Sequence, residues 1–146
     1  MLSPSEAKYP HLSERWATAL SWLSEGGRES NDFIAVAKIG SSIDVLSCGG
    51  KAYGLTNMLA HLMAIDRTSI VTSGPTPKSL EQLMRQVYEA GRSQILHGTH
   101  VDRLKSFAET KAFASQLATI ALLECATRLS KYSGPDNPKT FQTIPA

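Results

Sequence analysis

The sequence predicts an all-α protein, and three observations carry that prediction. Apolar residues recur at helical spacing along most of the 146 residues. No run alternates apolar and polar residues for long enough to predict a strand. Glycine and proline pairs separate the helical segments, so most connections are short. Helices joined by short connections favour an antiparallel up-and-down bundle, here of about five helices.

Three helices are expected in the first half of the chain. The first runs from about His11 to Ser24 and ends at the Gly26-Gly27 pair, because paired glycines commonly stop a helix. The second begins after capping residues around Asn31 and stops at Gly49-Gly50. The third is expected from about Leu55 to Ile65, with its leucines facing the core.

A loop over Asp66–Pro77, rich in glycine and proline, separates these helices from two more. Ile70-Val71 within it is expected to pack down as an anchor. The longest helix is predicted from roughly Asp102 to Lys131, and its alanines permit close packing. From residue 133 the chain is polar and rich in proline, so residues 1–132 are expected to form one domain and residues 133–146 a tail outside it.

The helix between the loop and the longest helix is amphipathic. Ser79 and Gln82 are spaced as a capping box at its start, although Pro77 is an alternative first residue, and it ends near Gly98. A helical wheel gathers its buried stripe as Leu80, Met84, Val87, Gly91 and Ile95. Gly91 within that stripe predicts a close crossing with another helix.

The net charge, the cysteine content and the lengths of the apolar runs argue against several classes of function. A net charge of +2 is too small to predict a broad nucleic-acid groove. Cys48 and Cys125 lie far apart without a CxxC partner, which predicts buried thiols rather than a disulfide framework or a zinc site. No apolar run approaches the roughly 18 residues that span a bilayer. We therefore expect a soluble cytoplasmic protein without membrane contact, metal or cofactor.

The segment from Arg92 to His97 carries the clearest chemical signal. Arginine grips a phosphate with two N–H groups at once, and histidine transfers protons near neutral pH. RNA supplies its own nucleophile, the 2′-hydroxyl, so a base, an acid and a cation suffice to cleave it without metal. In an ideal helix the two residues lie about 140° apart, so they share no face. Joint action needs either an irregular helix near Gly98 or two chains, one giving Arg92 and the other His97.

Several other residues are candidate supporting groups, each with a structural alternative. Arg85 lies one heptad before Arg92 and is a second candidate for RNA binding, and Tyr88 is on the same flank. Ser93 precedes His97 by four residues and could fix the imidazole tautomer, while His100 could swing toward the site. Asp44, the acidic residue of the second helix, is one further candidate. If it pairs with Arg92 or caps a helix, its role is structural. His11 and His61 have no evident partners and are expected to be ordinary histidines.

The stretch from Tyr88 to Gly98 resembles the HEPN superfamily, in particular its Apea-like branch. The family signature is an arginine, a polar residue and then a histidine four to six residues on, which Arg92, Ser93 and His97 match; Gly98 matches the His-Gly ending of that branch. A looser similarity extends over about Leu12 to Ser130. The resemblance implies a HEPN-like helical bundle that dimerises around a shared cleft.

The same resemblance implies a function. Many relatives are metal-independent ribonucleases of toxin–antitoxin or antiviral defence systems, with the residues matching Arg92 and His97 as the catalytic pair. RNA, a second copy of the chain and an antitoxin or larger defence complex are therefore the implied partners. Thr99 stands where some toxins carry a modified tyrosine, which argues against that form of antitoxin control. Other relatives are non-catalytic RNA-binding or protein-interaction modules, which is the alternative function.

Overall fold

The computed structural model describes residues 7–97 and 107–146, with the backbone alone for residues 92–97. The described chain is an all-α bundle, as predicted, and its only β-type pairing is an isolated bridge between Ile70 and Ser79. Its elements are α2 (Pro10–Arg28), α3 (Asp32–Ser47), α4 (Lys51–Met63), α5 (Leu80–His97), α6 (Ala108–Leu129) and the short 3-10 helix η1 (Thr140–Gln142).

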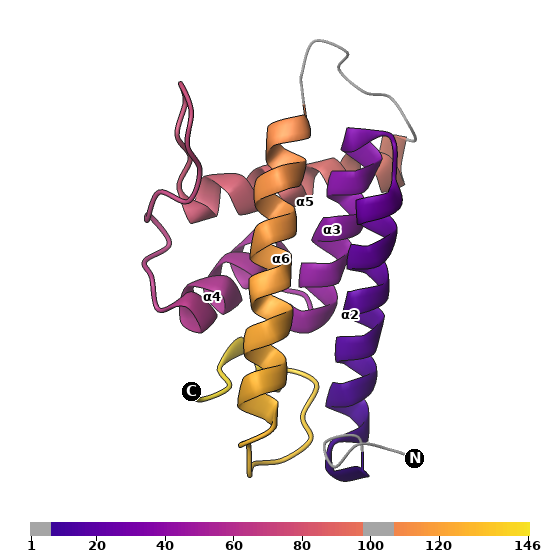
Figure 1. Ribbon diagram of the computed structural model, residues 1–146, viewed down its shortest axis with the longest axis vertical. Coiled ribbons are helices and arrows are strands. Elements are labelled where there is room, and N and C mark those ends of the chain that lie inside the picture. The colour runs from indigo at the N-terminus through magenta and orange to yellow at the C-terminus, as the bar shows by residue number, and fades with distance from the viewer. Residues whose placement is uncertain (1–6, 98–106) are drawn as a thin grey trace.

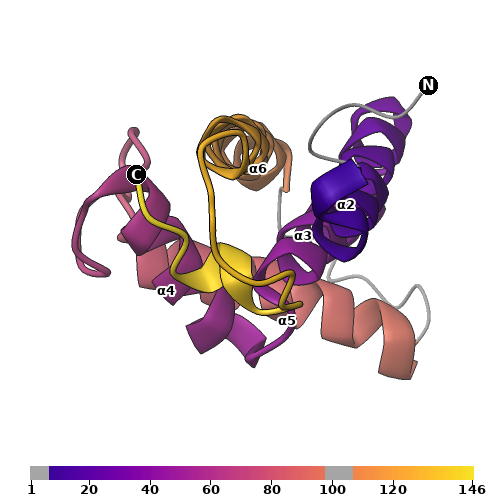
Figure 2. The same cartoon turned by 90° about the horizontal axis from the view of Figure 1, so that it is seen from below.

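The helices pack around one core in three groups: α2 with α3, α4 with α5, and α6 alone. In Figure 1, α2, α3 and α6 run along the long axis, and α2 and α3 are antiparallel neighbours, whereas α5 lies across them. Seen from below in Figure 2, α6 faces the layer made by α4 and α5, and α2 with α3 closes one side. Helix α3 is central, because ten of its 16 residues are buried. It is therefore the element against which α2, α5 and α6 all pack.

Two buried glycines set the spacing of the helices around α3. A Cβ at Gly26 of α2 would lie 2.8 Å from Ile39 Cγ1, and a Cβ at Gly40 of α3 would lie 2.8 Å from Val87 Cγ1. Both distances are too short for a real contact, so these crossings require glycine. Gly26 therefore serves packing rather than termination, and α2 continues through it to Arg28, beyond the predicted end.

Helices α3 and α4 are the most apolar of the described helices. Taken together, with a 70° bend at the break between them, they match a membrane-crossing segment in length and composition, whereas no single described helix does. Their apolar side chains line the core, and those that are fully buried or nearly so include Ile39, Ile43, Leu46, Leu55, Met58 and Leu59.

Residues 133–146 do not form a tail outside the domain, so that prediction was wrong. Phe141 is fully buried and Ile144 is 1% exposed, and both belong to the core. The segment passes beneath the bundle from the end of α6 toward α4 (Figures 1 and 2). Two apolar side chains three residues apart are enough to anchor it, although prolines and polar residues dominate its composition.

Candidate functional site

The N-terminus of α5, the helix that carries the predicted motif, is fixed by the expected capping box. Gln82 N donates to Ser79 Oγ at 3.3 Å, and Ser79 N donates to Gln82 Oε1 at 2.9 Å. The preceding loop is tied to itself, because Val71 N donates to Lys78 O at 3.0 Å. Val71 packs against the core as expected, but Ile70 is 62% exposed and anchors nothing. The capping box thereby sets the rotational register of α5.

Helix α5 buries one stripe against α3 and α4. The predicted Leu80, Met84 and Val87 are buried, and Leu83 and Ala90 join them. The close crossing expected at Gly91 is wrong, because a Cβ there would meet no described atom within 4 Å. The contact glycine lies on the partner helix instead, as Gly40 of α3. The solvent side of α5 is consequently the side opposite these residues.

The predicted site residues on α5 are described to different extents. Arg85 is exposed, whereas Tyr88 is half-buried and packs against the core. Arg92, Ser93 and His97 lie in the helical backbone of α5, but their side chains are outside the described residues, as is the whole of the predicted supporting residue His100. The structure therefore gives the helix that carries the motif but no side-chain geometry for it.

The backbone of α5 nevertheless bears on how Arg92 and His97 are arranged. The helix is α-helical through His97, so within one chain these two positions are about 140° apart around its axis. The described helix thus offers no irregularity before His97 that would bring them to one face. Of the two arrangements considered from the sequence, an irregular helix near Gly98 lies outside the described residues, and pairing across two chains stays a prediction.

Asp44 lies on α3 and is exposed, and its electrostatic neighbour among the described residues is Arg15 of α2. Surrounding protein atoms desolvate its carboxyl group and raise the pKa of Asp44 above the usual range, while the positive charge of Arg15 acts in the opposite direction. Arg15 is itself anchored, because its Nη1 donates to Val45 O at 3.0 Å. The described structure thus relates Asp44 to α2, and its relation to the Arg92 side chain falls outside the described residues.

An open cleft of about 670 Å³ lies beside the N-terminal half of α2. Its lining residues are His11, Glu14, Arg15, Thr18, Val45, Asp136 and Pro138. The Asp136 carboxylate accepts hydrogen bonds from the backbone N–H groups of His11 and Leu12, both at 3.0 Å, and so caps α2 from a distant part of the chain. Two of the charged residues in this cleft, Arg15 and Asp136, therefore bind backbone groups of the protein itself.

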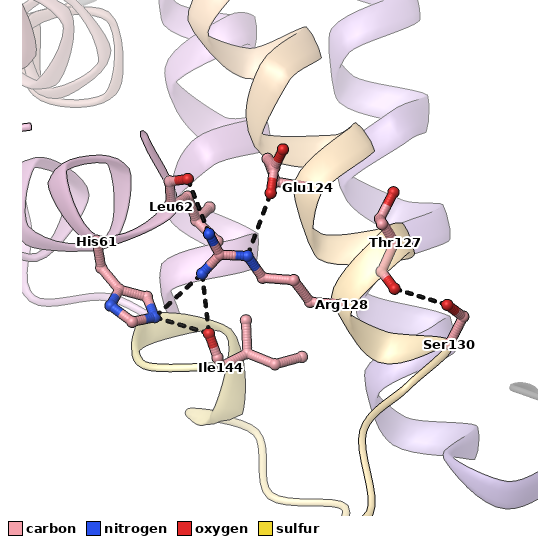
Figure 3. A network of polar contacts seen from close by, with 7 residues as sticks. All are labelled: His61, Leu62, Glu124, Thr127, Arg128, Ser130 and Ile144. Atoms are coloured by element: carbon pink, nitrogen blue, oxygen red, sulfur yellow. Dashed lines mark hydrogen bonds and ion pairs between the residues drawn. The ribbon is translucent and has the colours of Figure 1, made fainter. Parts of the chain in front are cut away.

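A polar network that sequence reasoning missed centres on the buried Arg128 of α6 (Figure 3). Its Nη2 donates to Leu62 O and its Nη1 to Ile144 O, both at 3.0 Å, and its Nε pairs with Glu124 at 3.2 Å. His61 Nε2 lies 2.7 Å from Ile144 O, so His61 is an ordinary histidine with a hydrogen-bond partner, although the sequence did not reveal that partner. With these donors engaged, the network joins α4, α6 and the C-terminal segment rather than forming a reactive centre. A glutamate one turn before an arginine in an Ala/Leu-rich helix was its only signal in the sequence.

Side chains of the types that can bind a metal ion do not cluster in the described part of the chain. In residues 7–97 and 107–146, no group of three His, Cys, Asp or Glu side chains is placed to hold a metal ion. Cys48 and Cys125 are both reduced, and burial raises the pKa of the Cys125 thiol to about 12.

Comparisons with protein-family models, with curated proteins and with solved structures found no match to this chain.

Proposed function

We propose that this chain is a metal-independent endoribonuclease of the HEPN type, with Arg92 and His97 as its catalytic residues. The observation that carries the proposal is that the signature residues Arg92, Ser93 and His97 belong to one helix, α5, of an all-α bundle. Helix α5 holds five of its earlier residues in the core, so its position is fixed by packing. A toxin or antiviral defence role, with an antitoxin or a larger complex as a further partner, follows from the HEPN resemblance alone.

The proposed reaction uses only groups of the chain and of RNA. His97 acts as general base or general acid near the scissile phosphate, and the Arg92 guanidinium holds the phosphate oxygens as negative charge grows. The 2′-oxygen attacks phosphorus while the bond from phosphorus to the 5′-oxygen breaks. The base takes the 2′-hydroxyl proton, and an acid returns a proton to the departing 5′-oxygen. The products are a 2′,3′-cyclic phosphate and a 5′-hydroxyl.

The site is proposed to be completed by a homodimer. The 140° separation of positions 92 and 97 prevents both side chains of one regular helix from meeting the same phosphate. A two-fold axis beside α5 would place Arg92 of one chain near His97 of the other, and would do so twice in each dimer. Light scattering at micromolar concentration is expected to give twice the monomer mass. A monomer there would contradict the composite site.

Incubation with mixed RNA tests the activity directly. In the presence of EDTA, the parent protein should cleave RNA, whereas Arg92→Ala and His97→Ala should lose at least about 100-fold in rate. His11→Ala is a matched control, because His11 is an exposed histidine on α2, away from the motif. Circular dichroism establishes that each variant folds. Equal activity in all four proteins, or none in the parent, would contradict the proposal.

The alternative function is a non-catalytic helical module that binds RNA or a protein partner, and the outer face of α6 favours it. Between residues 112 and 130 the two charged residues, Glu124 and Arg128, pair with each other. The exposed positions of that stretch are therefore uncharged, and they include Ile120 (37% exposed) and Leu123 (62% exposed). Residues 120 and 123 are neighbours on the helix surface, and exposed apolar residues grouped in this way are typical of interaction sites. The module predicts no RNA turnover and partner binding that survives His97→Ala.

A further inference from the structure

The most exposed aromatic side chain of the described residues lies close to the start of α5. Tyr53, on α4, is 65% exposed. The guanidinium carbon of Arg67 lies 5.0 Å from the centre of the Tyr53 ring, which is a cation–π contact. Because so much of the residue stays exposed beneath this arginine, the rest of the ring surface remains open to a second planar group.

Two contacts connect this aromatic pair to α5. Arg67 Nη2 lies 3.4 Å from Glu81 Oε2, and Glu81 N donates to Arg67 O at 3.0 Å. Glu81 is in the first turn of α5, so Tyr53 and Arg67 are held at the beginning of the motif helix. The pairing also offsets the charge of the Glu81 carboxylate.

From Glu81, one row of positions leads along α5 toward the motif. Residues 85, 88 and 92 follow at intervals of four, three and four, so the row is confined to about 60° of the helix circumference. Its length from Glu81 to position 92 is about 16 Å. Arg85 in this row is exposed, and Tyr88 is half-buried.

We propose that Tyr53, Arg67 and Arg85, here called the α4–α5 platform, bind single-stranded RNA and lead it to the motif. In this arrangement a base stacks on the Tyr53 ring, Arg67 holds the ring in place, and Arg85 contacts a phosphate between Tyr53 and position 92. This inference rests on the proposed function, because the row of residues along α5 leads to Arg92, which is proposed to be catalytic.

The chemistry of the platform selects single strands. A base can stack on an aromatic side chain only when its own face is exposed, which pairing in a duplex prevents. Every base has such a face, so stacking tolerates most sequences. The neighbouring exposed Glu89 lies one turn after Arg85 and limits the positive potential. Stacking should therefore contribute more than charge, and the dependence of affinity on salt should be shallow.

Binding of an uncleavable probe tests the platform separately from catalysis. The probe is a fluorescent 2′-O-methyl oligoribonucleotide of about 12 nucleotides, within the usual range of single-strand site sizes. Its blocked 2′-oxygen cannot act as nucleophile. By fluorescence anisotropy, the parent should bind this strand more tightly than the duplex of the same sequence. Tyr53→Ala should weaken binding about tenfold, and Tyr53→Phe should preserve it.

Two further variants complete the experiment. Trp22→Ala is the matched control, because Trp22 is an exposed aromatic residue of α2 outside the platform, and it should bind like the parent. Arg85→Gln should reduce the slope of log affinity against log salt by about 0.7, the effect of losing one phosphate contact on a single strand. Parent-like binding by Tyr53→Ala, equal affinity for the duplex, or no binding by the parent would each overturn the platform.

These outcomes are distinguishable from failure of the proposed ribonuclease. A parent that binds the probe but leaves ordinary RNA intact would refute the ribonuclease and retain the platform as an RNA-binding site. A parent that cleaves RNA, with Tyr53→Ala cleaving and binding equally well, would retain the ribonuclease and refute the platform.

Discussion

Replacing Arg128 with methionine should lower the free energy of unfolding by about 2–5 kcal/mol. Methionine keeps much of the aliphatic stem but removes every donor. The Leu62 carbonyl then loses its charged donor at 3.0 Å inside the protein, which costs about 1–3 kcal/mol. The Ile144 carbonyl keeps His61 as a donor, so its loss is nearer to 1 kcal/mol. The Glu124 carboxylate is 42% exposed, and its ion pair adds less than about 1 kcal/mol.

Urea unfolding followed by tryptophan fluorescence measures this difference, because the indole of Trp16 is bonded to Leu122 O in the folded bundle. Glu124→Gln is the matched control, since it removes the exposed ion pair and leaves both carbonyl bonds; its cost should stay below about 1 kcal/mol. An Arg128→Met cost below about 1 kcal/mol would refute the role given to the buried carbonyls. Equal costs in the two variants would show that the ion pair dominates.

Three other perturbations have effects of definite sign on stability. Gly40→Ala should destabilise the protein by about 1–3 kcal/mol, because its new methyl group meets Val87. Gly91→Ala has open space around it and should stabilise α5 by up to about 1 kcal/mol. The midpoints of urea unfolding compare the two variants with the parent. Burial raises the pKa of Cys125 from 9.0 to about 12, so between these values the unfolded chain ionises its thiol while the folded chain does not. Stability should therefore fall as the pH rises through this window, and by less in Cys125→Ala; equal slopes for the two proteins would contradict the assignment.

Local patterns in the sequence predicted the helices and the start of α5 well. The capping box of Ser79 and Gln82 is a contact between near neighbours, so its spacing is visible in the chain itself. The side-chain acceptor at Asn31 is a second local signal, and it does cap α3. The predictions at Gly26 and Gly91 were wrong because neither a glycine pair nor a helical wheel shows which residues of other helices lie opposite a glycine. Gly26 and Gly40 are required by Ile39 and Val87 on other helices.

Long-range contacts account for what the sequence did not predict. Phe141 and Ile144 are two apolar residues in a polar segment, and they become core residues because that segment folds back onto the bundle, where η1 packs against α3 and α4. Arg128 contacts residues 66 and 16 positions away in the chain, so no short pattern announces its role. The candidate site depends on the same kind of information. The helix that carries Arg92 and His97 was predictable, but a composite site depends on a second chain, which the sequence of one chain does not place.

Mixing two inactive variants tests the composite site. If each active site takes Arg92 from one chain and His97 from the other, a dimer of Arg92→Ala with His97→Ala contains one intact site and one site lacking both groups. Random exchange makes half of the dimers mixed, and half of their sites are intact, so the mixture should regain about one quarter of the parent activity. Sites formed within single chains would regain nothing, because no chain in the mixture has both residues. A mixture that stays inactive after verified subunit exchange would therefore refute the composite site.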